Sequence, residues 1–214
     1  MLKTLRNAFS VKDIRDRIIF TFLMLVVIRI GSQLPVPGVN GDVFRSWFQS
    51  QMAGLGFFDA ITGGSFLSMS VFALNITPYI TSSIIMQLLT IAIPALEEMH
   101  KDGEDGRKKI AEITRYLTVV LGLIQGTAYF FYLNNQRILA DDVAVWFAAI
   151  VIILIFTAGT AFMMWLGEQI NEKGIGNGIS LIIFGGIVSR IPSGLRSIYT
   201  QLTEGTLGVI TKAQ

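Results

Sequence analysis

The sequence predicts an all-α membrane protein, a polytopic bundle with five transmembrane helices. Three observations carry this prediction. Hydrophobic residues make up 52% of the 214 positions and charged residues only 15%, whereas a soluble domain has about 25% charged residues. The mean hydropathy is +0.59. Finally, five apolar runs come close to the roughly 20 residues that a helix needs to cross the hydrocarbon core.

The five apolar runs differ in how well they fit a membrane span. The third and fourth contain no charge, the second contains two prolines, and an arginine and a proline interrupt the outer third of the last. The first run has no small-residue cleavage site after the basic residues 1–17, so we expect it to remain as an anchor. The predicted spans are residues 18–34, 72–96, 116–133, 143–166 and 178–198.

The distribution of lysine and arginine predicts the orientation in the membrane. Basic residues cluster in residues 1–17, between Glu97 and Arg115, and at Lys173, whereas the opposite segments hold few. The N-terminus is therefore predicted to be cytoplasmic, and residues 199–214 are predicted to form a tail on the outer side.

Composition excludes several classes of site. The chain has no cysteine and one histidine, so a disulfide framework, a thiolate metal site and a histidine-cluster metal site are not expected. No nucleophile–base pair is evident, and we expect neither an enzyme nor a cofactor. A secondary transporter would need polar groups near the midplane, and only Asn75, Thr77 and Gln125 qualify.

Two residues inside the predicted spans are unusual. Arg29 lies five residues before Leu34, about 7.5 Å along a helix, so its side chain could reach the outer interface. A structural hydrogen bond or a role in binding a substrate are the alternatives for Arg29. Pro78 removes a helical hydrogen bond and predicts a kink, and the neighbouring Asn75 and Thr77 suggest that this kink faces protein or water.

The stretch "GLGFFDAITGGSFLSMS", residues 54–70, is too short and too polar to span the membrane. Gly63 and Gly64 provide a hinge, because a positive φ costs glycine little. Composition leaves two placements open. The segment could lie at the membrane interface, or it could re-enter the protein and be buried there.

The tract "WLGEQINEKGIGNGISLIIF", residues 165–184, connects the last two predicted spans through alternating glycines. It looks like a phosphate-binding loop, but no strand precedes it and the lysine spacing is wrong. We expect a close-packed turn with its backbone against a partner. Two isoleucine pairs are also spaced i, i+4, so that each pair lies on one helix face. These pairs are Ile76 with Ile80 and Ile179 with Ile183.

Several tracts resemble the SecY family of bacterial protein-translocation channel subunits. They are "IRIGSQLPVPG" (28–38), "FALNITPYITSSIIMQLL" (72–89), "KDGEDGRKKIAEITRY" (101–116) and "MWLGEQINEKGIGNGISLIIF" (164–184). The resemblance runs in order, with matching spacing, from about residue 18 to residue 192. It implies a non-catalytic channel that moves secretory polypeptides across the bacterial cytoplasmic membrane and inserts membrane proteins into it.

The resemblance also implies roles for individual residues. The four paired isoleucines would form a pore ring, because aliphatic side chains make no directional bonds to a passing chain and an apolar neck resists ions. Residues 54–70 would form a plug, a short helix that closes the pore from outside. Asn75, Thr77 and Pro78 would lie at the lateral gate toward lipid. The plug residues are Phe57, Phe58, Ile61, Gly63, Gly64, Phe66 and Leu67.

The implied partners are the small membrane subunits SecE and SecG, the SecA motor or the ribosome, signal peptides, nascent polypeptides and the bilayer. Cytosolic contacts are expected at Arg107, Lys108 and Lys109, although positive-inside anchoring would explain these residues equally well. Packing on SecE is expected at Glu168, Gly174, Gly176 and Gly178.

Channels of this family consist of two inverted halves of five spans each. The chain matches the first half, so the second half is expected as a further partner, and this chain alone is not expected to form a sealed channel. A membrane scaffold or chaperone, and a secondary transporter, stay open as alternatives.

Overall fold

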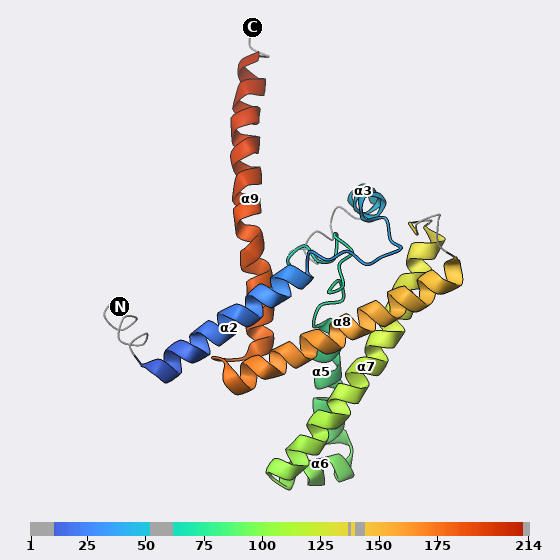
Figure 1. The fold of residues 1–214 in the computed structure, drawn as a ribbon, viewed down its shortest axis with the longest axis vertical. Coiled ribbons are helices and arrows are strands. Elements are labelled where there is room, and N and C mark those ends of the chain that lie inside the picture. The colour runs from blue at the N-terminus through green and yellow to red at the C-terminus, as the bar shows by residue number, and fades with distance from the viewer. Residues whose placement is uncertain (1–10, 52–61, 137, 140–143, 212–214) are drawn as a thin grey trace.

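A computed structural model describes residues 11–51, 62–136, 138–139 and 144–211. These residues form helices, turns and two isolated β-bridges, Pro35 with Ser70 and Val39 with Leu139. The predicted all-α class is confirmed. The helices, labelled as in Figure 1, are α2 (Lys12–Gly31), α3 (Gly41–Gln51), α5 (Thr77–Ala92), α6 (Pro94–Lys101), α7 (Glu104–Asn135), α8 (Val145–Lys173) and α9 (Gly178–Thr211).

Among the described residues, 3 helices are long and apolar enough to cross a membrane, or up to 4 if α5 and α6 together make one bent span. The three are α7, α8 and α9. Helix α2 covers most of the first predicted span but is not among them, because charged residues occupy its first two turns and Arg29 lies near its end. Membrane crossing by α2 therefore stays a prediction.

Helix α5 is shorter than the apolar run of the second predicted span, and a proline lies near each of its ends. Residues 71–76 form turns, and α5 begins at Thr77 with Pro78 in its first turn, where the missing N–H costs no helical hydrogen bond. The predicted kink at Pro78 is therefore wrong, since this proline begins the helix. At the far end Ile93 is extended, as a residue before proline prefers, and α6 continues at 101° to α5.

Helix α8 is the centre of the bundle (Figure 1). It packs along α7, α2 and α9 and also touches α5. Glycines permit the closest approaches, as in other membrane helix pairs. A Cβ atom at Gly159 would overlap the carbonyl oxygen of Val71, so only glycine fits this contact, whereas a Cβ at Gly126 of α7 would lie 3.5 Å from the carbonyl oxygen of Ile153.

The first and last helices meet near the C-terminal end of α8. Thr21 Oγ1 of α2 accepts a hydrogen bond from the Ile175 N–H at 3.1 Å, in the turn between α8 and α9. Helix α9 continues beyond its predicted span to Thr211, so the described part of the predicted outer tail is helical. The C-terminal half of α9 extends away from the other helices (Figure 1).

The loop predicted to lie on the outer side contains a helix that the sequence analysis did not predict. Helix α3 places Phe44 and Phe48 against Phe66, with ring centroids 5.6 and 5.5 Å apart. The Asn40 N–H donates to the carbonyl of Ile138 at 3.1 Å and ties this loop to the α7–α8 connection. The outer aromatic cluster, as we call it, consists of Phe44, Trp47, Phe48, Phe66, Tyr129 and Tyr132.

Candidate functional site

The four predicted ring isoleucines meet in one apolar cluster. Ile76 immediately precedes α5 and is 1% exposed, and Ile80 lies one turn further along. Ile179 and Ile183 lie on the first two turns of α9. Ile76 belongs to the buried part of the cluster, and the other three are half-buried and pack against it. The remaining buried members of this isoleucine cluster are Phe72, Met163, Leu166, Ile170 and Ile182.

The turn between α8 and α9 places the second isoleucine pair. The Gly178 N–H donates to Asn171 Oδ1 at 2.7 Å. A Cβ atom at Gly174 would overlap the carbonyl oxygen of Ile170, and one at Gly178 would overlap the carbonyl oxygen of Gly167. The contacts of these two glycines are thus internal to the chain. Gly176, with φ +72° and nothing near its Cβ position, stays a predicted contact for another subunit.

Arg29 contacts the predicted plug. Its Nη1 donates to the carbonyl oxygen of Gly63 at 2.6 Å and lies 3.4 Å from Ser32 Oγ. Of the roles considered for Arg29, the structure therefore contains the structural hydrogen bond. A guanidinium in a largely apolar helix needs such acceptors, because a buried charge without partners is costly.

The plug glycines lie between α2 and α9. Gly63 and Gly64 have φ of +65° and +92°, which glycine adopts freely. A Cβ at Gly63 would lie 3.0 Å from the Cα of Gly186 on α9, and one at Gly64 would lie 3.1 Å from the guanidinium of Arg190. Both positions therefore combine a positive φ with a close neighbour. A larger residue at Gly63 would press on the backbone of α9, and one at Gly64 would displace the Arg190 side chain.

The rest of the described plug folds as turns over residues 62–69, with no helix in that range. Phe66 belongs to the outer aromatic cluster, with its ring centroid 5.9 Å from that of Tyr129. Leu67 is half-buried against the same core. This part is anchored toward α3 and α7, whereas the predicted plug residues Phe57, Phe58 and Ile61 lie outside the described residues.

The residues predicted at the lateral gate lie at the start of α5, with Asn75 in the turn before the helix and Thr77 and Pro78 in its first turn. Asn75 has φ +52°, a conformation that asparagine tolerates better than most residues, and it is 8% exposed. Thr77 is exposed and Pro78 is buried. The three residues connect the plug turns to α5, and their role as a gate stays a prediction.

The polar groups considered for a transporter do not share one cavity. Thr77 and Gln125 line a cavity of about 440 Å³ between α3, the plug turns and α7. Asn75 lines a separate cavity of about 260 Å³ beside Arg29 and Ser32 of α2. A solute-coordinating site built from all three is therefore not present, and nothing favours the transporter alternative.

The predicted cytosolic contacts lie on the first turns of α7. Arg107, Lys108 and Lys109 are all exposed. Lys108 Nζ lies 3.7 Å from Asp105 Oδ1 in a solvent-exposed ion pair, which contributes little stability. These side chains are accessible to a partner or to lipid headgroups, so both interpretations stay open.

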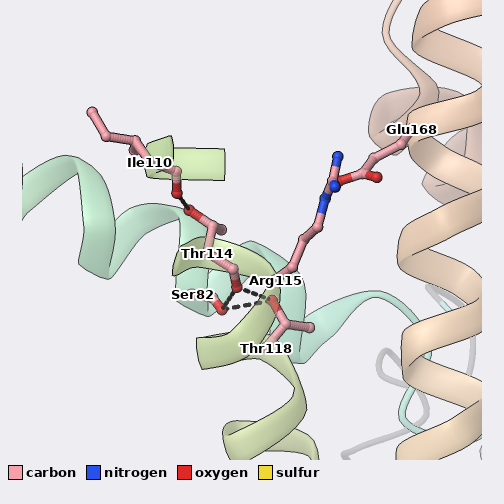
Figure 2. A network of polar contacts seen from close by, with 6 residues as sticks. All are labelled: Ser82, Ile110, Thr114, Arg115, Thr118 and Glu168. Atoms are coloured by element: carbon pink, nitrogen blue, oxygen red, sulfur yellow. Dashed lines mark hydrogen bonds and ion pairs between the residues drawn. The ribbon is translucent and has the colours of Figure 1, made fainter. Parts of the chain in front are cut away.

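Glu168, predicted to pack on a partner subunit, forms an ion pair within the chain. Its Oε1 accepts a hydrogen bond from Arg115 Nε at 2.9 Å, which joins α8 to α7 (Figure 2). The sequence analysis missed this pair, because 53 residues separate its members. Among the described residues, no group of three or more His, Cys, Asp or Glu could hold a metal ion.

Comparison with known proteins links this arrangement to a family. The family model of the SecY family matches residues 70–213 of this chain. The protein translocase subunit SecY of Bacillus licheniformis is 48% identical over 204 residues, covering 94% of this chain and 47% of that protein. The subunit of the same name from Thermotoga maritima is 47% identical over 207 residues, covering 93% of this chain and 48% of that protein. The chain spans about half the length of these curated relatives.

Two solved structures share the fold. One is Sec61 in the canine ribosome–channel complex from the endoplasmic reticulum, and the other is described as the structure of a protein conducting channel. Each has a TM-score of 0.61 and 20% sequence identity, and each alignment covers 89% of this chain and 42% of the other. At this identity the similarity concerns the fold alone.

Proposed function

Since the chain belongs to the SecY family, we propose that it forms one half of a channel for polypeptides in the bacterial cytoplasmic membrane. The channel would translocate secretory polypeptides and insert membrane proteins, with no catalysis of its own. The other half of the ring would come from the remaining half of the channel, the part of the relatives' length that this chain does not span.

The meeting of the four isoleucines supports this proposal most strongly. They come from helices about 100 residues apart in sequence, yet they lie in one cluster of hydrocarbon side chains. Side chains without hydrogen-bonding groups do not select among passing sequences. A narrow apolar constriction also loses water readily and so resists the passage of ions.

We further propose that residues 54–70 close this ring from the outer side. The support is the contact of Gly63 and Gly64 with α2 and α9, the two helices that flank the isoleucine cluster. Arg29 Nη1 donates a hydrogen bond to the Gly63 carbonyl oxygen, and Gly64 lies beside the guanidinium of Arg190. Displacement of the plug by an entering polypeptide would have to break the Arg29–Gly63 hydrogen bond.

The proposed partners follow the same family logic. SecE and SecG would pack on the membrane faces, and SecA or a ribosome would bind on the cytoplasmic side. Arg107, Lys108 and Lys109 are exposed where such a cytosolic partner could reach them. Signal peptides and nascent chains would be the substrates, and the N-terminus would be cytoplasmic.

Photo-crosslinking tests the channel function. A photoreactive residue would replace Ile80 or Ile183 in the full-length channel complex, loaded with a polypeptide stalled in transit. The matched control carries the probe at Leu154 of α8, which is 57% exposed on the outside of the described bundle. We expect crosslinks to the stalled chain from Ile80 and Ile183 and none from Leu154. A scaffold that does not conduct polypeptides would give no crosslink from any position.

A further inference from the structure

The two halves of the isoleucine cluster are connected through α7 as well as through their direct contacts. Helix α5 carries Ile80, and α9 carries Ile179 and Ile183. The backbones of α5 and α9 make no close approach, and α5 barely touches α8. Instead, α5 packs along α7, and α7 packs along α8. Helix α5 is therefore supported along its length mainly by α7, while the turn before α5 contacts α8 directly at Gly159 and Gly167.

Two polar links join these helices at the same level of α7 (Figure 2). Ser82 Oγ of α5 forms a hydrogen bond of 2.8 Å with Thr118 Oγ1. The same Ser82 Oγ lies 3.4 Å from the carbonyl oxygen of Thr114. Ser82 and Thr118 are both fully buried. The next residue, Arg115, extends to the other side of α7 and pairs with Glu168 of α8. One turn of α7 thus holds α5 on one side and α8 on the other.

The α8 end of this connection lies beside the isoleucine cluster. Glu168 follows Gly167, and a Cβ at Gly167 would lie 3.4 Å from the Cδ1 atoms of both Ile76 and Ile182. Tyr79, which lies between Ile76 and Ile80 in sequence, packs against the same cluster. A change in the Arg115–Glu168 separation would therefore alter the spacing of residues that form the cluster.

We propose that Arg115 and Glu168 are a positioning pair that sets the width of the ring. This role rests on the proposed channel function. The two residues would act on the ring without touching the substrate. The ion pair adds to the packing of α7 against α8 at this level, and the buried Ser82–Thr118 hydrogen bond makes α5 follow α7. Loss of the ion pair lets α7 and α5 move together away from α8, which separates Ile80 from Ile179 and Ile183.

The exposure of the pair limits its expected effect. The side chain of Arg115 is 47% exposed and that of Glu168 is 20% exposed. An ion pair of this exposure shifts an equilibrium by roughly two- to fivefold. The pair therefore adjusts the balance between the closed and open ring and does not determine whether the chain folds.

A charge swap in the full-length channel complex, reconstituted in liposomes, tests the proposal. The single variants are Arg115→Glu and Glu168→Arg, and the double variant combines them. We expect each single variant to raise the resting ion conductance about two- to fivefold, and the double variant to restore it toward the wild-type value. Lys101→Glu is the control, since it reverses a charge in the exposed Glu97–Lys101 pair of α6 and should leave conductance unchanged.

The outcomes separate this proposal from the channel function. Single variants with wild-type conductance, or a double variant as leaky as the single ones, would overturn the positioning role. If a reversal prevents assembly, Arg115→Gln and Glu168→Gln each break the ion pair without placing like charges together. Wild-type conductance in both of these variants would overturn the role as well. Failure of the wild-type complex to move a polypeptide would instead contradict the proposed function.

Discussion

The two apolar clusters of the chain use different side chains to do different work. The outer aromatic cluster joins α3, the plug turns and α7 through rings that meet mostly edge to face, such as Phe44 with Phe66 and Trp47 with Tyr132. The isoleucine cluster joins α5, α8 and α9 mostly through aliphatic side chains, with one stacked ring pair, Phe72 with Phe162. Ring pairs dominate one cluster, and aliphatic contacts dominate the other.

This difference indicates which part of the molecule is fixed. Aromatic pairs prefer particular orientations and contribute energy beyond the area they bury, so the outer cluster holds α3 and the anchored half of the plug in place. Aliphatic side chains keep their contact energy over a range of orientations, because dispersion contacts are individually weak and non-directional. A ring that opens and closes around unrelated chains needs the second kind of packing.

The largest loss of stability is expected from emptying the outer cluster. Phe44 is 1% exposed, and Phe44→Ala should lower the free energy of unfolding by about 3–5 kcal/mol, the usual cost of removing a buried phenylalanine. Thermal or denaturant unfolding of the purified chain in detergent measures this. A loss comparable to that of an exposed position such as Phe22→Ala would contradict the packing described for α3.

Closing the glycine contact between the clusters should have the next largest effect. A Cβ at Gly159 would overlap the Val71 carbonyl, so Gly159→Ala should lower the free energy of unfolding by about 2–3 kcal/mol through overpacking. Gly122→Ala is the matched control on α7, where the nearest atoms to a Cβ lie at 3.8 Å. Equal unfolding midpoints for the two variants would show that α8 is not this close to the turn before α5.

Removing the plug contact of Arg29 should have a moderate effect. Arg29→Gln loses the charged hydrogen bond to the Gly63 carbonyl, a contribution of about 1.5 kcal/mol. In the full-length complex we expect a higher resting ion conductance with unchanged binding of partners. Arg45→Gln is the control, because Arg45 is an exposed outer arginine on α3. Wild-type conductance in Arg29→Gln would show that this contact does not hold the plug.

Substitutions in the proposed ring should affect ion conductance according to the polarity of the new side chain. Ile80→Leu keeps the volume and the hydrocarbon surface, and volume-conserving swaps usually cost less than about 1.5 kcal/mol. We expect this variant to transport polypeptides and to stay sealed, whereas Ile80→Asn should leak ions because a polar group stabilises water in the constriction. Equal ion conductance in the two variants would show that hydrocarbon at this position is not what seals the pore.

The smallest effect is expected at the exposed pair of α6. A hydrogen bond from Lys101 lowers the pKa of the Glu97 carboxyl. The stabilisation by this pair is therefore present above the unfolded pKa of Glu97 and is lost as the pH falls through the lower folded value. Because the Glu97 side chain is exposed, Glu97→Gln at neutral pH should leave the unfolding temperature unchanged. A measurable drop would mean that α6 has a tighter contact than the structure shows.

The helical class could be predicted from sequence, because apolar run length carries it. The family motifs also pointed to four isoleucines that lie in one cluster, and their role as a pore ring stays a prediction. Local signals also existed where the prediction failed. Phe44, Trp47 and Phe48 are spaced i, i+3, i+4, the pattern of an amphipathic helix, which would have revealed α3. Pro78 was assigned to the helix interior because the apolar run extends beyond it, whereas proline is favoured in a first turn.

Other features depend on contacts that no local pattern contains. Arg115 and Glu168 are 53 residues apart, and Arg29 and Gly63 are 34 residues apart. An arginine near the end of a span looks the same whether it reaches lipid headgroups or a backbone carbonyl, since its flexible side chain suits both. Tertiary packing decides between the two, and the sequence alone left them open.

Spin-label accessibility gives the most direct test of the isoleucine ring. This chain has no cysteine, so once any cysteines in the rest of the complex are replaced, single labels can be introduced at Ile80→Cys, Ile183→Cys and the exposed reference position Leu154→Cys. We predict that labels at 80 and 183 are shielded from oxygen dissolved in the lipid, while the label at 154 collides with it freely. Labels at 80 and 183 as accessible as the one at 154 would place these isoleucines in the acyl chains and contradict a shared pore.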